Sequence, residues 1–396
     1  MSLDLIQVAA QITGLAQRLR AEDGGRVERL QRVLDLFRSA DIASLSRKIE
    51  ASAERVSWPV AGLAGGLASS CEPPECPSGF AVAATDGSHI DVDRHSSARC
   101  YLINIGKVVL HYGDSPGARL DSQASLHFGD DLALTDPRNG RRELIEGALL
   151  GVKRSIDELQ ALEQLSGDIP QDNPALALVD GSLILWGLSP RDYEGYIKEE
   201  LLDRQYLETL DRLERRAGGG GFALASYISY PRSAEVVNAL RLWLCPYDIA
   251  DCERGGCQRE CDAIAGVTDS DIFESFLEPG QRSAIFLSGS RFVQKHYGGH
   301  RVYFFYVRRD EEVARLEVPQ WVAADETLVG MVHAIILDQC RRGHGYPVAL
   351  MEAHEKAVVT AADREGFRLL MERALADERI DVRSSGKSRS KRTRWV

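Results

Sequence analysis

Residues 80–90 read Phe-Ala-Val-Ala-Ala-Thr-Asp-Gly-Ser-His-Ile, and this stretch decides the fold. Residues 81–84 are small and apolar, so they fit between neighbouring strands of a sheet, while Asp86-Gly87-Ser88 favours a turn. The pattern predicts a buried strand that ends in an acidic turn. The carboxylate of Asp86 is then left at the edge of the sheet.

A second copy of this pattern occupies residues 175–184, which read Ala-Leu-Ala-Leu-Val-Asp-Gly-Ser-Leu-Ile. One Asp-Gly-Ser sequence after an apolar run is explained by a plain turn, because Asp and Gly are common turn formers. Two copies, each behind an apolar strand, would hold Asp86 and Asp180 side by side. Paired carboxylates are what a divalent metal site needs, so we expect both to bind metal.

The surrounding patterns predict an α/β fold. Apolar runs at 100–105 and 107–112 indicate two more strands with Gly106 in a tight turn between them, and Asp136-Pro137 is a helix start signal. The order strand, strand, strand, helix, strand is thus expected between residues 80 and 185. Strands are expected at 222–229, 284–287, 302–308 and 346–350, and helices at 183–216, 233–244, 326–341 and 352–376.

The two ends of the chain differ from this central part. Residues 1–57 have helical periodicity, broken at Gly24-Gly25, and indicate either a helical arm for self-association, as in a homodimer, or helices that pack on the main domain. Residues 383–396 contain no acid and several basic residues, which predicts a disordered tail. The main domain is expected over residues 78–382.

The bulk properties limit the class of protein. A net charge of -11 argues against a general nucleic-acid coat, although a nuclease with a local basic path is still compatible with it. No apolar run reaches membrane-spanning length, and the first residues do not resemble a signal peptide. We therefore expect a cytoplasmic protein that does not bind membranes.

Four of the eight cysteines lie within residues 245–261, around Gly255-Gly256. Such a group can bind Zn²⁺ as a structural tetrad and close an irregular insertion. Its spacing lacks the usual paired CxxC pattern, so an iron–sulfur cluster or four uncoordinated thiols are alternatives. The four are Cys245, Cys252, Cys257 and Cys261.

The predicted arrangement resembles the ribonuclease-H-like fold, a mixed sheet flanked by helices. The paired Asp-Gly-Ser motifs, residues 227–229 (Tyr-Ile-Ser) and residues 346–357 (Tyr-Pro-Val-Ala-Leu-Met-Glu-Ala-His-Glu-Lys-Ala) resemble the NurA family over roughly residues 80–375. This resemblance implies a DNA nuclease that depends on Mn²⁺ or Mg²⁺ and works as a 5′ to 3′ exonuclease with single-strand endonuclease activity. It also implies a homodimer bound to a HerA-type hexameric ATPase, a DNA translocase, in end resection during double-strand-break repair.

Carried over to this chain, the resemblance makes Asp86 and Asp180 the strand carboxylates, Glu143 the helix carboxylate and His354 the imidazole ligand. Glu146 is the alternative to Glu143, because it lies one helical turn further on. A lone histidine is more often a surface or core residue, but the position of His354 in the end motif favours a ligand. An imidazole ligand suits Mn²⁺ better than Mg²⁺.

Three further residues are candidates for substrate binding. Tyr227 at the end of a strand would either contact DNA or belong to the core. Arg142 and Lys356 would either neutralise the scissile phosphate or remain solvated helix charges. Two other functions stay open: an inactive ribonuclease-H-like adaptor subunit of a ring translocase, and an RNA-cleaving enzyme of the same fold.

Overall fold

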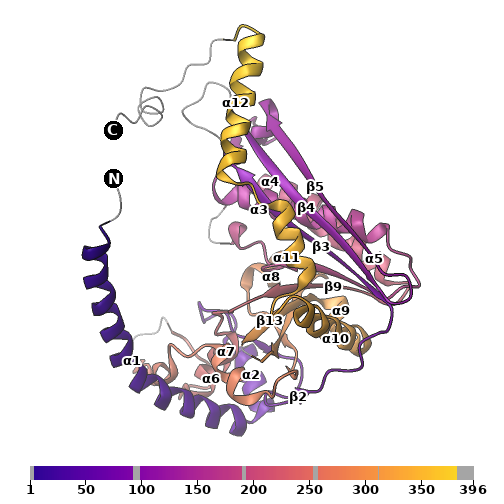
Figure 1. The fold of residues 1–396 in the computed structure, drawn as a ribbon. Coiled ribbons are helices and arrows are strands. Elements are labelled where there is room, and N and C mark those ends of the chain that lie inside the picture. Colours follow the sequence, from indigo (N-terminus) through magenta and orange to yellow (C-terminus); the bar gives the residue numbers. More distant parts are fainter. Residues whose placement is uncertain (1–3, 92–98, 190–192, 253–256, 311, 381–396) are drawn as a thin grey trace. The chain divides into compact units, whose positions relative to one another are not determined.

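The structure is a computed structural model that describes residues 4–91, 99–189, 193–252, 257–310 and 312–380 (Figure 1). Contacts divide the chain into two compact units. Met1–Pro73 and Ile228–Gln320 form one, here named the cysteine unit, and Pro74–Tyr227 and Trp321–Val396 form the other, here named the aspartate unit. Residues 228–320, which the sequence placed in the main domain, thus group with the N-terminal helices. The basic tail, 383–396, lies outside the described residues.

The aspartate unit contains a mixed sheet with the strand order β5-β4-β3-β8-β9. Strands β3, β4 and β5 are antiparallel to one another, whereas β8 runs parallel to both β3 and β9. Three antiparallel strands, a helix and a parallel strand beside the first are the predicted ribonuclease-H-like arrangement, so the fold class is confirmed. The strands are Phe80–Ile90 (β3), Cys100–Tyr112 (β4), Gly117–Phe128 (β5), Ala175–Asp180 (β8) and Phe222–Ile228 (β9).

The boundaries of the first three strands differ from the prediction. Strand β3 does not turn at Asp86 but continues to Ile90, because β4 pairs with it along its whole length. Gly106 lies inside β4 and makes no turn; the chain turns instead after Tyr112, where Gly113 has a φ of +111°. The third strand, β5, was not predicted from the sequence, because nearly all of its residues are exposed and it lacks an apolar pattern.

Helices α3 (Ala148–Gly167) and α11 (Val348–Ala357) cover opposite faces of this sheet. Successive residues of a strand face opposite sides. A Cβ on Gly87 would meet Arg154 of α3, whereas a Cβ on Gly106, the neighbour of Asp86 across the ladder, would meet Ala353 of α11. Covering on both faces explains why the central strands read as continuous apolar runs.

The helix start expected at Asp136-Pro137 is wrong. The chain forms a short hairpin there, and α3 begins only at Ala148. Its strands are Ala133–Thr135 (β6) and Arg142–Leu144 (β7). Asp136 accepts a hydrogen bond from the backbone N–H of Arg138, and Gly140 has a φ of +73°. These residues therefore favour a turn, although Asp-Pro is also a helix start signal.

Two predictions near the end of the chain also change. Residues 346–350 do not form a strand, because Pro347 precedes the first turn of α11 and its ring suits a helix start. The single helix expected at 352–376 is two helices, α11 and α12 (Ala361–Asp377). Thr360 begins α12 with a capping box to Asp363, which separates them. The preceding helix is α10 (Glu326–Arg342), and α4 (Gly195–Lys198) and α5 (Glu208–Ala217) lie between β8 and β9.

The strands of the cysteine unit pair antiparallel in the order β1-β11-β12-β13. Its core is aromatic and includes Phe37, Phe273 and Tyr306. The strands are Gly62–Leu63 (β1), Ser70–Cys71 (β2), Arg282–Ser283 (β10), Phe286–Leu287 (β11), Val302–Arg308 (β12) and Val313–Pro319 (β13), and the helices of the later segment are Glu235–Leu244 (α6), Asp269–Phe276 (α7) and Arg291–His296 (α8).

The N-terminal helices are α1 (Leu5–Ser39) and α2 (Ile42–Ser52). The break expected at Gly24-Gly25 is absent, since α1 continues through it. Val33 and Phe37 near the C-terminal end of α1 are buried in the core, whereas Ile6 and Leu15 are exposed. Among the described helices, none has both the length and the apolar character needed to cross a membrane.

Candidate active site

Asp86 and Asp180 lie at the same edge of the sheet. Strands β3 and β8 are parallel, and Thr85 pairs with Val179, so each acid is the next residue of its strand. The side chain of Asp86 is 17% exposed, and both acids line one pocket of about 440 Å³. The predicted pairing of the two carboxylates is therefore present in the fold.

His354 joins Asp86 from the opposite end of the sequence. Its Nδ1 atom lies 2.7 Å from Oδ2 of Asp86, within hydrogen-bonding distance. Helix α11 can approach this closely because residue 106 has no side chain: a Cβ there would lie 2.1 Å from the carbonyl oxygen of Ala353. Gly106 is thus required for close packing that brings the imidazole to the carboxylate.

The C-terminus of α11 is held by two side chains of the sheet. Ser88 and Asn104 form a pair across β3 and β4, and both donate hydrogen bonds to the carbonyl oxygen of Ala357, at 2.5 Å and 2.9 Å. The last carbonyls of a helix have no partner within the helix, so such donors stabilise its end. The Ser of the first Asp-Gly-Ser motif therefore helps to hold the helix that carries His354.

Glu158 of α3 is a buried acid beside the two aspartates. It is 6% exposed, and its Oε1 atom has no hydrogen-bond partner, although Nε of Arg154 lies 3.1 Å away in an ion pair. Thr85 donates a hydrogen bond to the Glu158 carbonyl and so ties α3 to β3. A Cβ at position 87 would lie 2.5 Å from Oε1, so glycine is needed there too.

The surroundings of Glu158 disfavour its ionised form. Burial raises its pKa from 4.5 to about 8; Arg154 opposes this rise, and the negative charges of Asp86 and Asp180 add to it. A bound cation would offset this penalty, because its positive charge favours the ionised form of all three carboxylates. An acid that is buried without a hydrogen bond beside two other acids is thus typical of a place prepared for positive charge.

Tyr346 contacts the second aspartate. Its hydroxyl donates a hydrogen bond to the Asp180 carboxylate. Asp180 is exposed as a residue, yet desolvation raises the pKa of its carboxylate. The hydrogen bond from Tyr346 lowers this pKa, and the negative charge of Asp86 raises it further. Burial and the charge of Asp180 raise the pKa of the Tyr346 hydroxyl, so it stays a donor.

The donor types in this pocket suit a hard divalent cation. Asp86, Glu158 and Asp180 supply carboxylate oxygens, which Mg²⁺ and Mn²⁺ prefer, and Oε1 of Glu158, which has an ion pair but no hydrogen bond, is an oxygen to which a ligand bond could be made. The pocket also contains the guanidinium of Arg154 and the exposed ring of Trp186. Such a site can hold an anionic substrate next to bound metal.

Glu143, predicted from the sequence to be the helix carboxylate, does not lie on a helix or in this pocket. Glu143 lies in strand β7, opposite Leu134, and neither it nor Glu146 lines the pocket. Glu158 occupies the place expected of the helix acid, since it is on the helix between the two aspartate strands. The available signal was an acid directly before Leu159, beside the apolar face of that helix.

The three candidates for substrate binding have different surroundings. Tyr227 is fully buried and packs edge-on against Tyr346, with ring centroids 5.4 Å apart, so it takes the core alternative. Arg142 lies in β7, exposed, and is 3.5 Å from Asp130. Lys356 is exposed on α11, two residues after His354, but is not among the residues that line the pocket.

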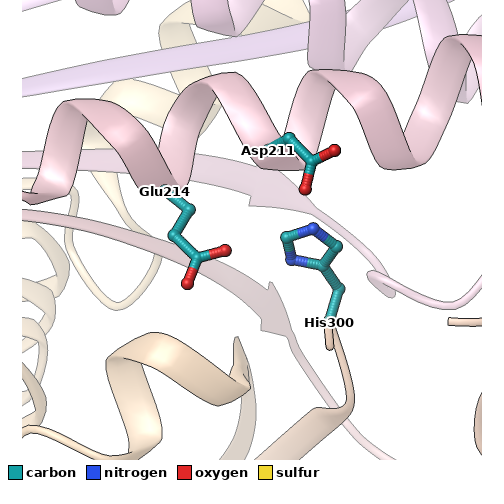
Figure 2. A group of neighbouring side chains, drawn as sticks. All are labelled: Asp211, Glu214 and His300. Atoms are coloured by element: carbon teal, nitrogen blue, oxygen red, sulfur yellow. The ribbon is translucent and has the colours of Figure 1, made fainter. Parts of the chain in front are cut away.

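Two acids lie on helix α5, away from this pocket. Asp211 and Glu214 are both exposed and project from one face of the helix (Figure 2). His300, drawn in the same picture, belongs to the cysteine unit, whereas α5 belongs to the aspartate unit. Acids three residues apart on an exposed helix face are common without any ligand, so we assign this pair no site.

The four clustered cysteines belong to the cysteine unit. Cys245 ends helix α6, and Cys261 lies in the short turn Glu260–Ile264, where Arg241 of α6 hydrogen-bonds its side chain. Burial raises the pKa of the Cys252 thiol, and the charges of Cys261, Cys245 and Cys257 raise it further. All eight cysteines of the chain lie in described residues, and none of them forms a disulfide bond there.

Of three comparisons with known proteins, one matches a family model and one matches solved structures. The family model described as NurA domain matches residues 80–359. Among solved structures, the NurA nuclease from Sulfolobus solfataricus is 14% identical, with a TM-score of 0.46 over 78% of this chain and 88% of that one. LC9-RNase H1, a type 1 RNase H with the type 2 active-site motif, is 9% identical, with a TM-score of 0.22 over 43% of this chain and 72% of that one. A search among curated proteins found no match.

Proposed function

Because the chain belongs to the NurA domain family, we propose that it is a nuclease that hydrolyses DNA with the help of divalent metal ions. One observation carries the proposal: Asp86, Glu158 and Asp180 line one pocket, and His354 lies against the first of them. Three carboxylates in a shared pocket are costly unless positive charge binds there. Phosphodiester hydrolysis with metal ions uses such a set.

Asp86, Asp180 and Glu158 would hold the metal, and Glu158 takes the role that the sequence assigned to Glu143. When bound, divalent cations supply positive charge that polarises the phosphodiester and makes a water molecule more acidic. Mn²⁺ or Mg²⁺ suits the oxygen ligands, and an imidazole in the set would favour Mn²⁺. The described residues contain no activated nucleophile in this pocket, so attack by water on phosphorus is the expected course.

The remaining polar residues would orient this set. With Nδ1 of His354 bonded to Asp86, only Nε2 is available for a cation or a proton, and the bond directs the carboxylate. Tyr346 would keep the Asp180 carboxylate in position through its hydroxyl. Arg154 would compensate Glu158 in the metal-free protein and contribute positive charge toward a phosphate once the metal is bound.

Family membership also supports more specific proposals. We propose that the chain acts as a 5′ to 3′ exonuclease with single-strand endonuclease activity, in end resection with a HerA-type translocase. We further propose that it is a homodimer and works in the cytoplasm in the repair of double-strand breaks. The exposed apolar side chains of the first half of α1, including Ile6 and Leu15, are available for such an association.

A separate proposal concerns the cysteine unit: Cys245, Cys252, Cys257 and Cys261 bind one Zn²⁺. Two of them are anchored on neighbouring elements, because Arg241 lies one helical turn before Cys245 and also bonds Cys261. Besides burial, the charges of Cys261, Cys245 and Cys257 raise the pKa of the Cys252 thiol, so the four thiols lie in one neighbourhood. A zinc ion would close the segment between α6 and the turn at Glu260–Ile264.

The nuclease proposal is tested with end-labelled linear DNA and MnCl₂. We expect wild-type protein to shorten the DNA and EDTA to stop it, while Asp86→Asn and Asp180→Asn lose the activity but keep the thermal unfolding midpoint within a few degrees. Adding a HerA-type translocase from the same source should raise the rate. Undiminished digestion by purified Asp180→Asn protein would contradict the proposed site.

A further inference from the structure

Trp186 is an exposed aromatic residue beside the three carboxylates. It begins the short turn Trp186–Leu188 and is 46% exposed, and it lines the same pocket as Asp86 and Asp180. Large apolar rings that remain exposed in a polar pocket often contact a ligand. The proposed hydrolysis itself does not use this ring.

The ring is held in place from the second Asp-Gly-Ser motif. The indole Nε1 atom of Trp186 donates a hydrogen bond to Oγ of Ser182 at 3.2 Å, and the same oxygen accepts one from the backbone N–H of Ile184 at 3.0 Å. Ser182 stands two residues after Asp180. The plane of the indole is therefore coupled to the turn that carries a carboxylate of the site.

The neighbouring helix leaves space beside the ring. Gly187 packs tightly on α3, since a Cβ there would lie 2.6 Å from the Val152 side chain. On the same helix, Ala148 and Gly151 line the pocket with little or no side chain, and a Cβ at Gly151 would meet nothing within 4 Å. The turn is thus fixed on α3, while small residues keep the pocket open next to the indole.

We propose that Trp186 is a substrate-positioning residue on which the base of an unpaired nucleotide stacks, next to the phosphodiester to be cleaved. This inference rests on the proposed nuclease function. Every base presents a flat π-face, so an aromatic platform binds single-stranded nucleic acid without reading its sequence. The sugar-phosphate chain would extend from the stacked base toward the carboxylates, and Arg154 places a positive charge in the same pocket.

The experiment compares Trp186→Ala, Trp186→Phe and wild type on two single-stranded DNA oligonucleotides with Mn²⁺. One oligonucleotide is ordinary; the other carries an abasic nucleotide at the position of cleavage. Tyr230→Ala serves as a matched control, since Tyr230 is a 77% exposed aromatic in the cysteine unit. Thermal unfolding is measured for every variant.

On ordinary DNA we expect Trp186→Ala to lower kcat/KM roughly 5- to 150-fold, mainly through KM, while Trp186→Phe keeps most of the activity. On abasic DNA, Trp186→Ala and wild type should differ by less than about twofold, because no base is present to stack. Equal losses on both substrates, or no loss on either, would overturn the inference and leave the nuclease function intact. If the wild type cleaves neither oligonucleotide, the proposed function fails and this inference fails with it.

Discussion

Nδ1 of His354 lies 2.7 Å from Oδ2 of Asp86, although 268 positions separate the two residues in the chain. The contact forms because α11 packs on Gly106, the cross-strand neighbour of Asp86, and because Ser88 and Asn104 hold the end of that helix. The imidazole is otherwise largely in solvent, with 62% of its side chain exposed. Its contribution is therefore expected in activity and scarcely in stability.

His354→Ala should lower the rate of Mn²⁺-dependent DNA cleavage roughly 10- to 100-fold, because a group that orients a metal-binding carboxylate is lost. The unfolding midpoint should change little, as expected for an exposed side chain. Initial rates on end-labelled DNA and a thermal scan check both statements. A rate within twofold of wild type would show that the contact is not used.

Glu158→Gln and Glu143→Gln discriminate between the two helix-acid assignments. Glu158→Gln should abolish detectable Mn²⁺-dependent cleavage, because the glutamine cannot supply the carboxylate charge to the cation. Glu143→Gln should keep wild-type activity, because Glu143 is on β7 and does not line the pocket. The reverse result would restore the assignment made from sequence.

Gly106→Ala should destabilise the protein by about 1–3 kcal/mol or more, because the new methyl group would overlap the backbone of α11. Activity should fall as well, since the helix carries His354. Gly117→Ala is the matched control: Gly117 is exposed at the start of β5, and a Cβ there meets nothing within 4 Å. The free energy of unfolding in urea and the cleavage rate are measured for both variants. Equal values for Gly106→Ala and Gly117→Ala would contradict the packing argument.

Asp269 in the cysteine unit predicts a pH dependence of stability. Burial raises its pKa from 3.8 to about 7, against the effect of hydrogen bonds from the Val237 N–H, the Tyr306 hydroxyl and the Val236 N–H. The pKa of Asp269 is thus higher in the folded protein than in the unfolded chain. The stability that its protonated form contributes is fully present below about pH 4. A few kcal/mol of unfolding free energy are lost as pH rises to about 7. Denaturant unfolding between pH 4 and 8 should show a flatter profile for Asp269→Asn, and an unchanged slope would refute this.

Protein purified without chelators should contain about one equivalent of Zn²⁺ if the four-cysteine proposal is correct. Cys257→Ser should lose the metal, whereas Cys71→Ser, in strand β2 outside the cluster, should retain it. Elemental analysis decides the matter. Less than roughly a tenth of an equivalent of zinc or iron in the wild type would exclude a metal tetrad.

The sequence by itself determined the central sheet and two of its acids. Asp86 and Asp180 each follow a run of buried residues, and local patterns of this kind can be read directly because both faces of these strands are covered. The prediction from local sequence was wrong where a glycine is compatible with more than one structural role. Gly106 suits a tight turn, yet it lies within β4 because only a residue without a side chain fits beneath α11.

Only the tertiary structure decided which glutamate joins the aspartates. Glu143 and Glu158 both lie between the two motifs, and the only local signal for Glu158 is its place before Leu159; the choice depends on where α3 begins and on how its side chains pack against Gly87. The same holds for Trp186, which lines the pocket through packing of the turn at Gly187, and for the contact between His354, which the end motif indicated, and Asp86, which depends on packing of α11. Periodicity records which face of an element is buried, whereas the position of a side chain in a site depends on contacts between elements distant in sequence.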